Sequence, residues 1–329
     1  MRVLLSGYYG LGNLGDEAIL AGLAPALRSR GVELTVLSGD PDATAAIHEV
    51  GAASRTTGAP MALLRCQALV SGGGGLLQDS TSSRSLSYYL GLLRAAKALG
   101  KRTAVFAQSL GPLSGAGRDK VARTLRGVPV AVRDEQSLRL AADMGLRAEM
   151  VADPALLLPL PEPRRSTGEP YVLLIPRGGF DEFNAALLRL AQALTAAGES
   201  VAALAMHPRL DDPAVAALRQ AVPGVKALAA TTPHEALRII ADAQCVVSVR
   251  LHGCILATLA KVPCVALSYD PKVAGFAALA GIEVLEPASE PAHLLAASQK
   301  AVAVTESAHA DLVAGAHRGV DWLVERLSS

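Results

Sequence analysis

An arginine and a histidine two positions apart form the stretch of this chain best suited to chemistry. Arg250-Leu251-His252-Gly253 comes between an apolar strand-like run, 245–249, and an apolar helical run, 255–260. Unpaired backbone N–H groups and the helix dipole favour an anion at the start of a helix. Arginine adds a fixed, forked cation that suits phosphate or carboxylate, and histidine can gain or lose a proton near neutral pH. The stretch therefore predicts a site that holds a small anion and moves a proton.

Other predicted strands in the second half of the chain also end in cationic residues. Arg177 lies in Pro-Arg-Gly-Gly after one strand, and His207 precedes a proline after the next. Lys272, in Tyr-Asp-Pro-Lys, follows a third strand and opens a helix. Any one of these residues alone would more often be a solvated surface group. Together with Arg250 and His252 they predict a cationic pocket for a ligand that carries at least two negative charges.

Strand ends in the first half carry glycines and polar residues instead. The first strand leads into a glycine-rich loop that contains Asn13 and Asp16, and a later strand leads into Ser-Gly-Gly-Gly-Gly-Leu-Leu-Gln-Asp. Consecutive glycines let the backbone approach a ligand or a facing domain closely, with a tight crossing that binds nothing as the alternative. Asn13 and Asp16 could bind a hydroxylated ligand, with Asp16 as a base, or Asp16 could simply cap its helix. In the second loop Gly73 and Gly74 would approach the ligand. Gln78 and Asp79 of the same loop would contact sugar hydroxyl groups.

The glycine pattern after the first strand could also be interpreted as a dinucleotide-binding loop. Three glycines match the G-x-G-x-x-G pattern: Gly10, Gly12 and Gly15. Asp40 also ends the second strand, where a ribose-binding acid would lie. However, the first strand ends at Gly7, so the pattern begins three residues late. Asp16 and Glu17 would also repel a pyrophosphate at the start of the helix, which argues against nicotinamide or flavin binding.

Strand and helix signals alternate along nearly the whole chain. Strands are predicted at 2–6, 33–37, 68–70, 103–107, 128–132, 171–175, 201–205, 225–228, 245–249 and 262–267, with helices that include 16–30 and 306–327. The stretch 154–170 contains five prolines, which neither a helix nor a central strand tolerates. We therefore expect two doubly wound Rossmann-like α/β domains, 1–155 and 171–329, that face each other across a cleft and are joined by a linker, 156–170.

Composition excludes several classes of function. The 329 residues carry 31 basic and 30 acidic side chains and are only 3% aromatic, so nucleic-acid binding is not expected. The sequence has no metal-ligand spacing, no phosphate-binding G-x-x-x-x-G-K-[ST] loop and no hydrolase elbow. Four cysteines without C-x-x-C spacing are typical of reduced, buried thiols. With neither a signal peptide nor an apolar run of ~20 residues, we expect a cytoplasmic protein.

The strand-end motifs, taken in order, resemble the polysaccharide pyruvyl transferase family. Within it they resemble the bacterial enzymes that pyruvylate a secondary cell-wall polymer for S-layer anchoring. The matching pieces are Gly-Tyr-Tyr-Gly-Leu-Gly-Asn-Leu-Gly-Asp-Glu, Ser-Gly-Gly-Gly-Gly-Leu-Leu-Gln-Asp, Ala-Val-Arg-Asp, Arg-Leu-His-Gly and Ser-Tyr-Asp-Pro-Lys-Val, spread over residues 7–273. The segment around Arg177 departs somewhat from the family's form.

The resemblance implies a GT-B-like fold and a reaction without a cofactor or metal. The donor would be phosphoenolpyruvate, and the acceptor a lipid-linked saccharide that contains N-acetylmannosamine. The products would be a 4,6-linked pyruvate ketal and phosphate. The residues that would bind the donor are Arg177, Arg250, Leu251, His252, Lys272 and Arg133. Those on the acceptor side would be Asn13, Asp16, Gly73, Gly74, Gln78 and Asp79. Catalysis would fall to His252, Asp16 and Arg250.

Other functions are also consistent with the sequence. A GT-B sugar-nucleotide glycosyltransferase of cell-envelope polysaccharide synthesis is the second hypothesis, and a non-catalytic sugar-binding module is the third. Arg133-Asp134 could be a surface ion pair rather than a cleft element. A predicted helix that carries four basic residues could rest on anionic lipid at the inner face of the cell membrane, or could be an ordinary solvated face: Arg118, Lys120, Arg123 and Arg126.

Overall fold

The chain divides into two compact units. The computed structural model describes residues 1–80, 82–161, 169–268 and 270–328. Unit 1 comprises Met1–Leu11, Asp16–Leu158 and Val313–Ser329, and unit 2 comprises Gly12–Gly15 and Pro159–Leu312. The division between Leu158 and Pro159 falls inside the proline-rich stretch 156–170, of which 162–168 lies outside the described residues.

The units differ from the sequence-based domains in two places. The tetrapeptide Gly12–Gly15 belongs to unit 2, and Val313–Ser329 belongs to unit 1. The last helix, α13 (Glu306–Ser328), therefore contributes to both units. Its second half joins unit 1 because Val320, Leu323 and Leu327 are buried in that unit's core.

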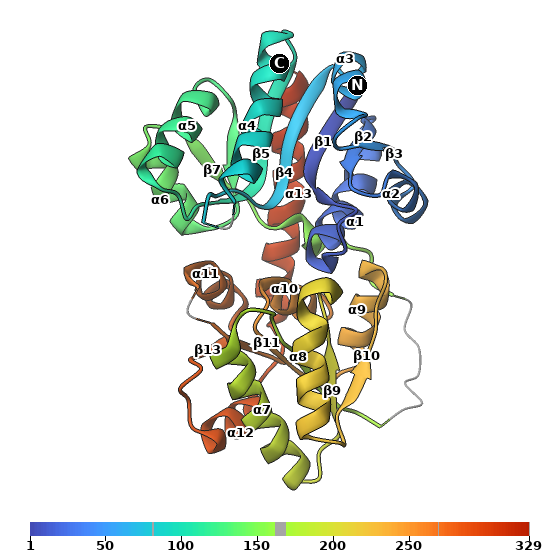
Figure 1. Cartoon of the computed structure of the whole chain (residues 1–329), viewed down its shortest axis with the longest axis vertical. Helices are drawn as coiled ribbons and strands as arrows, with labels where there is room; N and C mark the ends of the chain where they lie inside the picture. Colours follow the sequence, from blue (N-terminus) through green and yellow to red (C-terminus); the bar gives the residue numbers. More distant parts are fainter. Residues whose placement is uncertain (81, 162–168, 269, 329) are drawn as a thin grey trace. The chain divides into compact units, whose positions relative to one another are not determined.

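Within the described residues of unit 1, seven strands form a parallel sheet in the order β3-β2-β1-β4-β5-β6-β7 (Figure 1). The strands are β1 (Arg2–Tyr9), β2 (Glu33–Ser38), β3 (Gly51–Ser54), β4 (Ala68–Leu77), β5 (Arg102–Leu110), β6 (Val130–Val132) and β7 (Ala148–Met150). The connecting helices are α1 (Leu14–Arg28), α2 (Pro41–His48), α3 (Ala59–Arg65), α4 (Ser83–Ala98), α5 (Gly115–Leu125) and α6 (Glu135–Asp143), followed by the short 3-10 helix η1 (Pro154–Leu157). The strand order reverses direction between β1 and β4, so this sheet is doubly wound.

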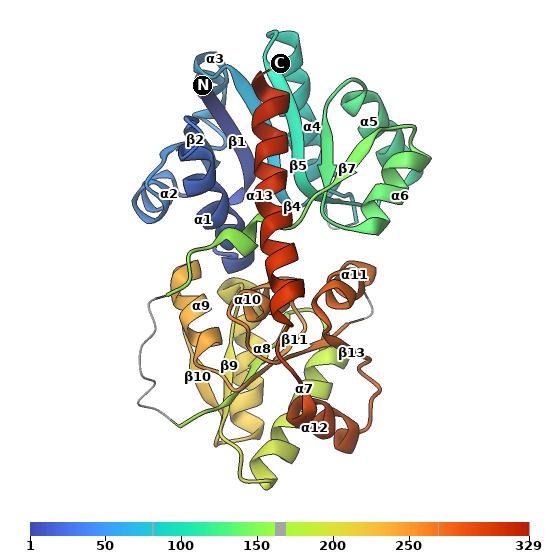
Figure 2. The same ribbon diagram turned by 180° about the vertical axis from the view of Figure 1, so that it is seen from behind.

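Side chains that alternate along β1 build a core on each face of this sheet. Val3 and Leu5 pack with apolar residues of α1 and α13, while Leu4 packs with residues of α3, α4 and α5. Figure 2 shows α13 running along the first of these faces. The central strands are covered on both faces, which explains why they are recognisable as continuous apolar runs.

The run of four glycines forms part of β4 rather than a loop after it. From the sequence this strand is expected to end at residue 70, but β4 continues to Leu77, with an irregularity in its pairing to β5 after Gly74. Gly73 and Gly74 have φ of +68° and +78°. Glycine adopts these angles without strain, so the strand can bulge there and continue.

Over the described part of unit 2, six strands form a second parallel sheet in the order β10-β9-β8-β11-β12-β13. The strands are β8 (Val172–Ile175), β9 (Val201–Leu204), β10 (Lys226–Leu228), β11 (Cys245–Ser248), β12 (Cys264–Leu267) and β13 (Glu283–Leu285). The helices are α7 (Asp181–Ala196), α8 (Pro208–Ala221), α9 (Pro233–Ala241), α10 (Leu251–Leu259), α11 (Pro271–Ala280) and α12 (Pro291–Lys300). Apolar residues of α7, α8 and α12 cover one face, and α10 contacts β11, β12, α9 and α11.

The expected fold class of two Rossmann-like α/β domains is confirmed. All four cysteines of the sequence lie in described segments, are buried and form no disulfide. Burial raises the pKa of the Cys245 thiol to about 12, so that thiol stays protonated. Among the described residues, no helix is both long and apolar enough to cross a membrane.

Candidate functional site

The cationic strand ends of unit 2 meet where its strand order reverses. β8 and β11 are neighbours, with Ile175 paired to Ser248 at their carboxyl ends. Arg177 lies two residues after the end of β8, and Arg250 lies two residues after the end of β11. Doubly wound sheets bind ligands at this topological switch point because the loops diverge there and leave a crevice. The sheet therefore places two of the predicted anion-binding arginines, Arg177 and Arg250, at its topological switch point.

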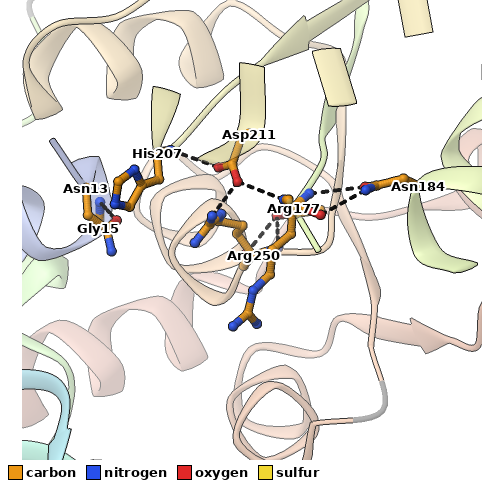
Figure 3. Close-up of polar contacts among 9 residues, drawn as sticks. Asn13, Gly15, Arg177, Asn184, His207, Asp211 and Arg250 are labelled. Atoms are coloured by element: carbon orange, nitrogen blue, oxygen red, sulfur yellow. Dashed lines mark hydrogen bonds and ion pairs between the residues drawn. The ribbon is translucent and has the colours of Figure 1, made fainter. Parts of the chain in front are cut away.

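A buried carboxylate that sequence analysis did not single out ties these loops together (Figure 3). Asp211, in the first turn of α8, is fully buried. Its Oδ1 accepts a hydrogen bond of 2.9 Å from Gly178 N and forms an ion pair with Nη2 of Arg250. Its Oδ2 accepts a bond of 2.8 Å from His207 N. One side chain therefore fixes the loops after β8 and β9 and the arginine after β11.

Arg250 is held at both its backbone and its side chain. Its N donates to Ser248 Oγ at 3.0 Å, and that hydroxyl donates to Arg250 O at 2.7 Å. Its side chain is only 14% exposed. Nε is buried and has no hydrogen-bond partner within the part of the chain that the structure describes. A buried donor left in this state is costly, so Nε is well suited to a ligand oxygen.

Arg177 is positioned by α7. Its N donates to Asn184 Oδ1 at 3.2 Å, and Asn184 Nδ2 donates to Arg177 O at 2.8 Å, as Figure 3 shows. Its guanidinium carbon lies 4.0 Å from the ring centre of Phe180, which is a cation–π contact. The loop after β8 is therefore fixed by contacts with both α7 and Asp211.

His252 lies in the first turn of α10 and packs against the tetrapeptide Gly12–Gly15. A methyl group added at Gly15 would overlap Nδ1 of His252, so only glycine fits there. The tetrapeptide is anchored by a bond of 2.8 Å from Leu14 N to Met206 O, and Gly15 N donates to Asn13 Oδ1 at 3.0 Å. Asn13, predicted on the acceptor side, thus lies in unit 2.

His207 is a second histidine of this site. It is buried, and burial lowers the pKa of its imidazole, with the charge of Arg250 acting in the same direction and Asp211 opposing it. The imidazole is therefore neutral at neutral pH. A neutral ring can donate one hydrogen bond and accept another, which suits it to orient a ligand without adding charge.

Leu251 and Lys272 also lie at the carboxyl edge of this sheet. Leu251 is the first residue of α10, and Lys272 lies at the start of α11, whose first turn is capped by a bond of 3.0 Å from Lys272 N to Asp270 Oδ1. α11 follows β12, the neighbour of β11. Tyr269 of the same motif lies outside the described residues.

In unit 1 the structure brings Asp16 together with the glycine run. Asp16 is buried in the first turn of α1, and a methyl group at Gly74 would lie 2.6 Å from its Oδ1. Gly73 lies against Ile19 of the same helix. Burial, with the charges of Asp16 and Glu17 adding to it, raises the pKa of the Tyr9 phenol well above its usual value. The carboxylate thus lies at the switch point between β1 and β4, near a phenol that stays protonated.

Gln78 and Asp79 lie beyond β4 and connect to α5. Asp79 accepts bonds from Ser114 N at 2.8 Å and Ser114 Oγ at 2.5 Å, and Gln78 Oε1 accepts from Ser80 Oγ at 2.8 Å. The Ser114 hydroxyl, together with its backbone N–H, lowers the pKa of the Asp79 carboxyl. Because Ser114 caps α5, Asp79 has a structural function that accounts for these contacts.

Arg133, predicted to bind the donor, belongs to unit 1. It is nearly buried, donates from Nε to Ser109 Oγ at 3.0 Å and forms an ion pair with Asp153. The alternative of a surface ion pair between Arg133 and Asp134 is wrong. Asp134 instead caps α6 through Ser137 N and accepts a bond of 2.6 Å from Ser109 Oγ.

Two acids near the dinucleotide-like glycine pattern, Glu17 and Asp40, bond to groups of the chain itself. Glu17 accepts a bond of 2.7 Å from Gly10 N and contacts Nε2 of the buried His48 at 2.9 Å. Asp40 caps α2 by accepting from Ala43 N at 3.1 Å. The described residues contain no group of three or more His, Cys, Asp or Glu side chains that could hold a metal ion.

Solved structures define the class of this fold. The UDP-GlcNAc 2-epimerase from Methanocaldococcus jannaschii matches with a TM-score of 0.67 and 12% identity over 98% of this chain and 99% of that chain. Anabaena Alr3699/HepE in complex with UDP-glucose matches with a TM-score of 0.65 and 13% identity over 99% of each chain. At such identities the similarity concerns the fold, which is that of GT-B glycosyltransferases and epimerases.

The family follows from the sequence itself. Residues 13–271 match the family Polysaccharide pyruvyl transferase, so the chain belongs to that family of transferases. The matched region includes the run of four glycines, Arg177 and the Arg-Leu-His stretch. No curated protein matches the chain.

Proposed function

We propose that this protein transfers pyruvate from phosphoenolpyruvate to a lipid-linked saccharide that contains N-acetylmannosamine. The product would be a 4,6-linked pyruvate ketal, with release of phosphate. Membership of the family supports the reaction type. The observation that carries the donor assignment is the pair of strand-end arginines at the switch point of unit 2. One of them, Arg250, has a buried Nε without a hydrogen-bond partner among the described residues.

The donor is a small molecule with a phosphate and a carboxylate, and the cations of unit 2 suit both groups. In this proposal Arg177, Arg250 and Lys272 bind the two anions and offset the charge on the departing phosphate. The start of α10, at Leu251 and His252, adds backbone N–H groups that favour an anion. The pairing with Asp211 fixes the direction of the Arg250 guanidinium before the donor arrives. Arg133 remains a proposed donor ligand, and in unit 1 its side chain is held by Ser109 and Asp153.

The chemical steps require one proton at carbon and the loss of two hydroxyl protons. A proton added to the methylene carbon of the donor makes the neighbouring carbon electrophilic, and one acceptor hydroxyl adds there. Departure of phosphate and attack by the second hydroxyl close the ketal. One hydroxyl proton balances the new methyl group, and the other leaves with hydrogen phosphate. We assign the proton transfer to His252 as general acid–base.

On the acceptor side we propose that Asp16 orients a sugar hydroxyl or takes its proton. Asp16 is buried next to Gly73 and Gly74, where the lack of side chains lets its carboxylate lie close to the backbone of β4. Gln78 and Asp79 would contact the outer part of the saccharide, with the contacts to Ser80 and Ser114 holding them in place. Asn13 would act from unit 2.

The test is acceptor-dependent release of phosphate from phosphoenolpyruvate with a synthetic N-acetylmannosamine-containing acceptor. His252→Ala should bind phosphoenolpyruvate nearly as well as the wild type and lose turnover by at least about 100-fold. His317→Ala, an exposed position on α13, is the matched control and should keep full activity. Turnover of the His252 variant within a few-fold of the wild type would contradict the proton-transfer assignment.

A sugar-nucleotide glycosyltransferase is the second candidate, because the similar fold of Alr3699/HepE was solved with UDP-glucose. Such an enzyme would release a nucleotide from a UDP-sugar and no phosphate from phosphoenolpyruvate, so the same assay separates the two. The S-layer-anchoring subtype, a cytoplasmic location and attachment at the inner face of the membrane belong to the proposal as well. The basic helix α5 is the feature that suggests membrane attachment.

A further inference from the structure

A hollow of about 260 Å³ between α4 and α5 of unit 1 collects positive charge. Four cationic side chains and one hydroxyl line it: Arg94, Lys97, Lys120, Arg123 and Thr124. Among the described residues, no acidic side chain lines this hollow. The chain as a whole carries a net charge of only +1, so the excess is a local property of this surface.

Each of the two helices contributes a pair of cationic side chains to the hollow. Arg94 and Lys97 are three residues apart on α4, as are Lys120 and Arg123 on α5, so each pair shares one helix face. The helices pack against each other. Like charges brought together in this way repel each other and are destabilising unless an anion is bound.

Lys97 also joins the ends of the two helices. Its Nζ donates to Thr124 O at 3.1 Å and to Arg126 O at 2.9 Å, at the carboxyl end of α5. Arg94 and the two cations of α5 are exposed. The hollow is therefore anchored by one lysine, with three exposed cations available to a ligand.

The size and surroundings of the hollow favour phosphate groups at a lipid surface. Its volume is below the ~300 Å³ at which pockets for drug-sized molecules begin, and arginine and lysine together suit a phosphate. Arg126, just after α5, is exposed, and Leu99, just after α4, is 47% exposed. A basic surface with an exposed apolar side chain is the composition that binds the headgroup region of anionic membranes.

This surface is separate from the candidate acceptor residues. α4 ends just before β5 begins, and α5 ends just before β6, so both helices run toward the amino ends of the strands. Asp16 and Gly74 lie at the opposite, carboxyl edge of the same sheet. Attachment through the hollow would therefore leave the carboxyl edge of unit 1 accessible.

We propose that the α4–α5 hollow is a binding site for the phosphate groups of anionic lipids and attaches unit 1 to the membrane surface. The inference deepens the proposed membrane location and rests on it. It requires no part of the pyruvyl transfer chemistry.

The experiment is sedimentation of the full chain with phosphatidylcholine vesicles that contain or lack phosphatidylglycerol. The triple variant Arg94→Gln, Lys120→Gln, Arg123→Gln leaves the bonds of Lys97 in place. It should bind the anionic vesicles about tenfold more weakly than the wild type, and high salt should abolish binding by the wild type.

A charge-matched control removes the same number of exposed cations elsewhere, with Arg65→Gln, Arg139→Gln and Arg219→Gln. It should bind the vesicles within about twofold of the wild type. Equal binding by the wild type to both kinds of vesicle, or equal loss in both triple variants, would overturn the proposal. So would binding of soluble pyrophosphate or single-stranded DNA through these residues without binding of anionic vesicles.

The outcome is independent of the proposed activity. The hollow variant should release phosphate at the wild-type rate with a soluble acceptor. Vesicle binding without acceptor-dependent phosphate release would contradict only the proposed function, and phosphate release without vesicle binding would contradict only the lipid site.

Discussion

Replacement of Asp211 by asparagine should remove the carboxylate that holds the cationic residues of unit 2 in place. The substitution keeps the size of the side chain but removes the charge that pairs with Arg250. It also brings an amide donor toward the backbone N–H groups of Gly178 and His207, which now donate to carboxylate oxygens. Fully buried Asp211 cannot exchange these partners for water.

The expected cost follows from this burial. Loss of one partner of a buried ion pair costs about 3–5 kcal/mol. The lower end applies, because the Arg250 side chain keeps 14% exposure and can regain some hydration. A loss of about 3 kcal/mol corresponds to a fall in Tm of about 6–12 °C for a domain of this size. The matched control is Asp212→Asn, the exposed neighbour in sequence, which should change Tm by about 1 °C or less.

Stability alone would not show that Asp211 positions Arg250, so the variant must also be assayed with donor. Below its melting temperature the Asp211 variant should have a KM for phosphoenolpyruvate raised about tenfold, equivalent to about 1.4 kcal/mol of lost donor binding. The kcat at saturating donor should fall much less. A Tm equal to that of the Asp212 variant, or a fall in kcat with KM unchanged, would refute this reasoning.

Three other substitutions test the geometry of the two units. In the wild type, Tm should fall between about pH 7.5 and pH 5.5, because the unfolded chain takes up a proton near pH 6.5 that the buried His207 imidazole resists. His207→Gln should make this fall in Tm smaller. An unchanged profile of Tm against pH would argue against a neutral buried ring. Gly15→Ala should reduce turnover by displacing His252, measured as kcat with saturating donor, and wild-type kcat would show that this packing is dispensable. Gly74→Ala should lower Tm by several degrees because of its positive φ and a nearby carboxylate oxygen, whereas Gly75→Ala, which meets no neighbouring atom, should not; equal values would contradict the strain argument.

The central strands of the two described sheets are predictable from the sequence, whereas three of their four edge strands are not. Runs such as 172–175 and 245–248 are apolar throughout because both faces of a parallel sheet are covered. β3, β7 and β13 are absent from the sequence-based prediction. Each lies at the edge of its sheet, is three or four residues long and is partly exposed, so it carries little apolar signal.

The candidate site shows the same division between local and tertiary information. The cations Arg177 and Arg250 could be predicted because each lies two residues after an apolar strand. Asp211 was missed, because its importance depends on contacts with loops more than thirty residues away in the chain. The available signal was its place in the first turn of a helix that begins at a strand end, four residues after His207. The partner of Arg133 was misjudged for a similar reason, since Asp153 is brought to it by the sheet.

The measurement that tests the central claim most directly is calorimetric titration of phosphoenolpyruvate into the wild type and into Arg250→Met. The account predicts that the wild type binds phosphoenolpyruvate and that the variant binds at least about 100-fold more weakly, because a charge-assisted grip on phosphate or carboxylate is lost. Arg219→Met, an exposed position on α8, should bind as the wild type does. Equal affinity of the wild type and the Arg250 variant, or binding of UDP-glucose in place of phosphoenolpyruvate, would contradict the account.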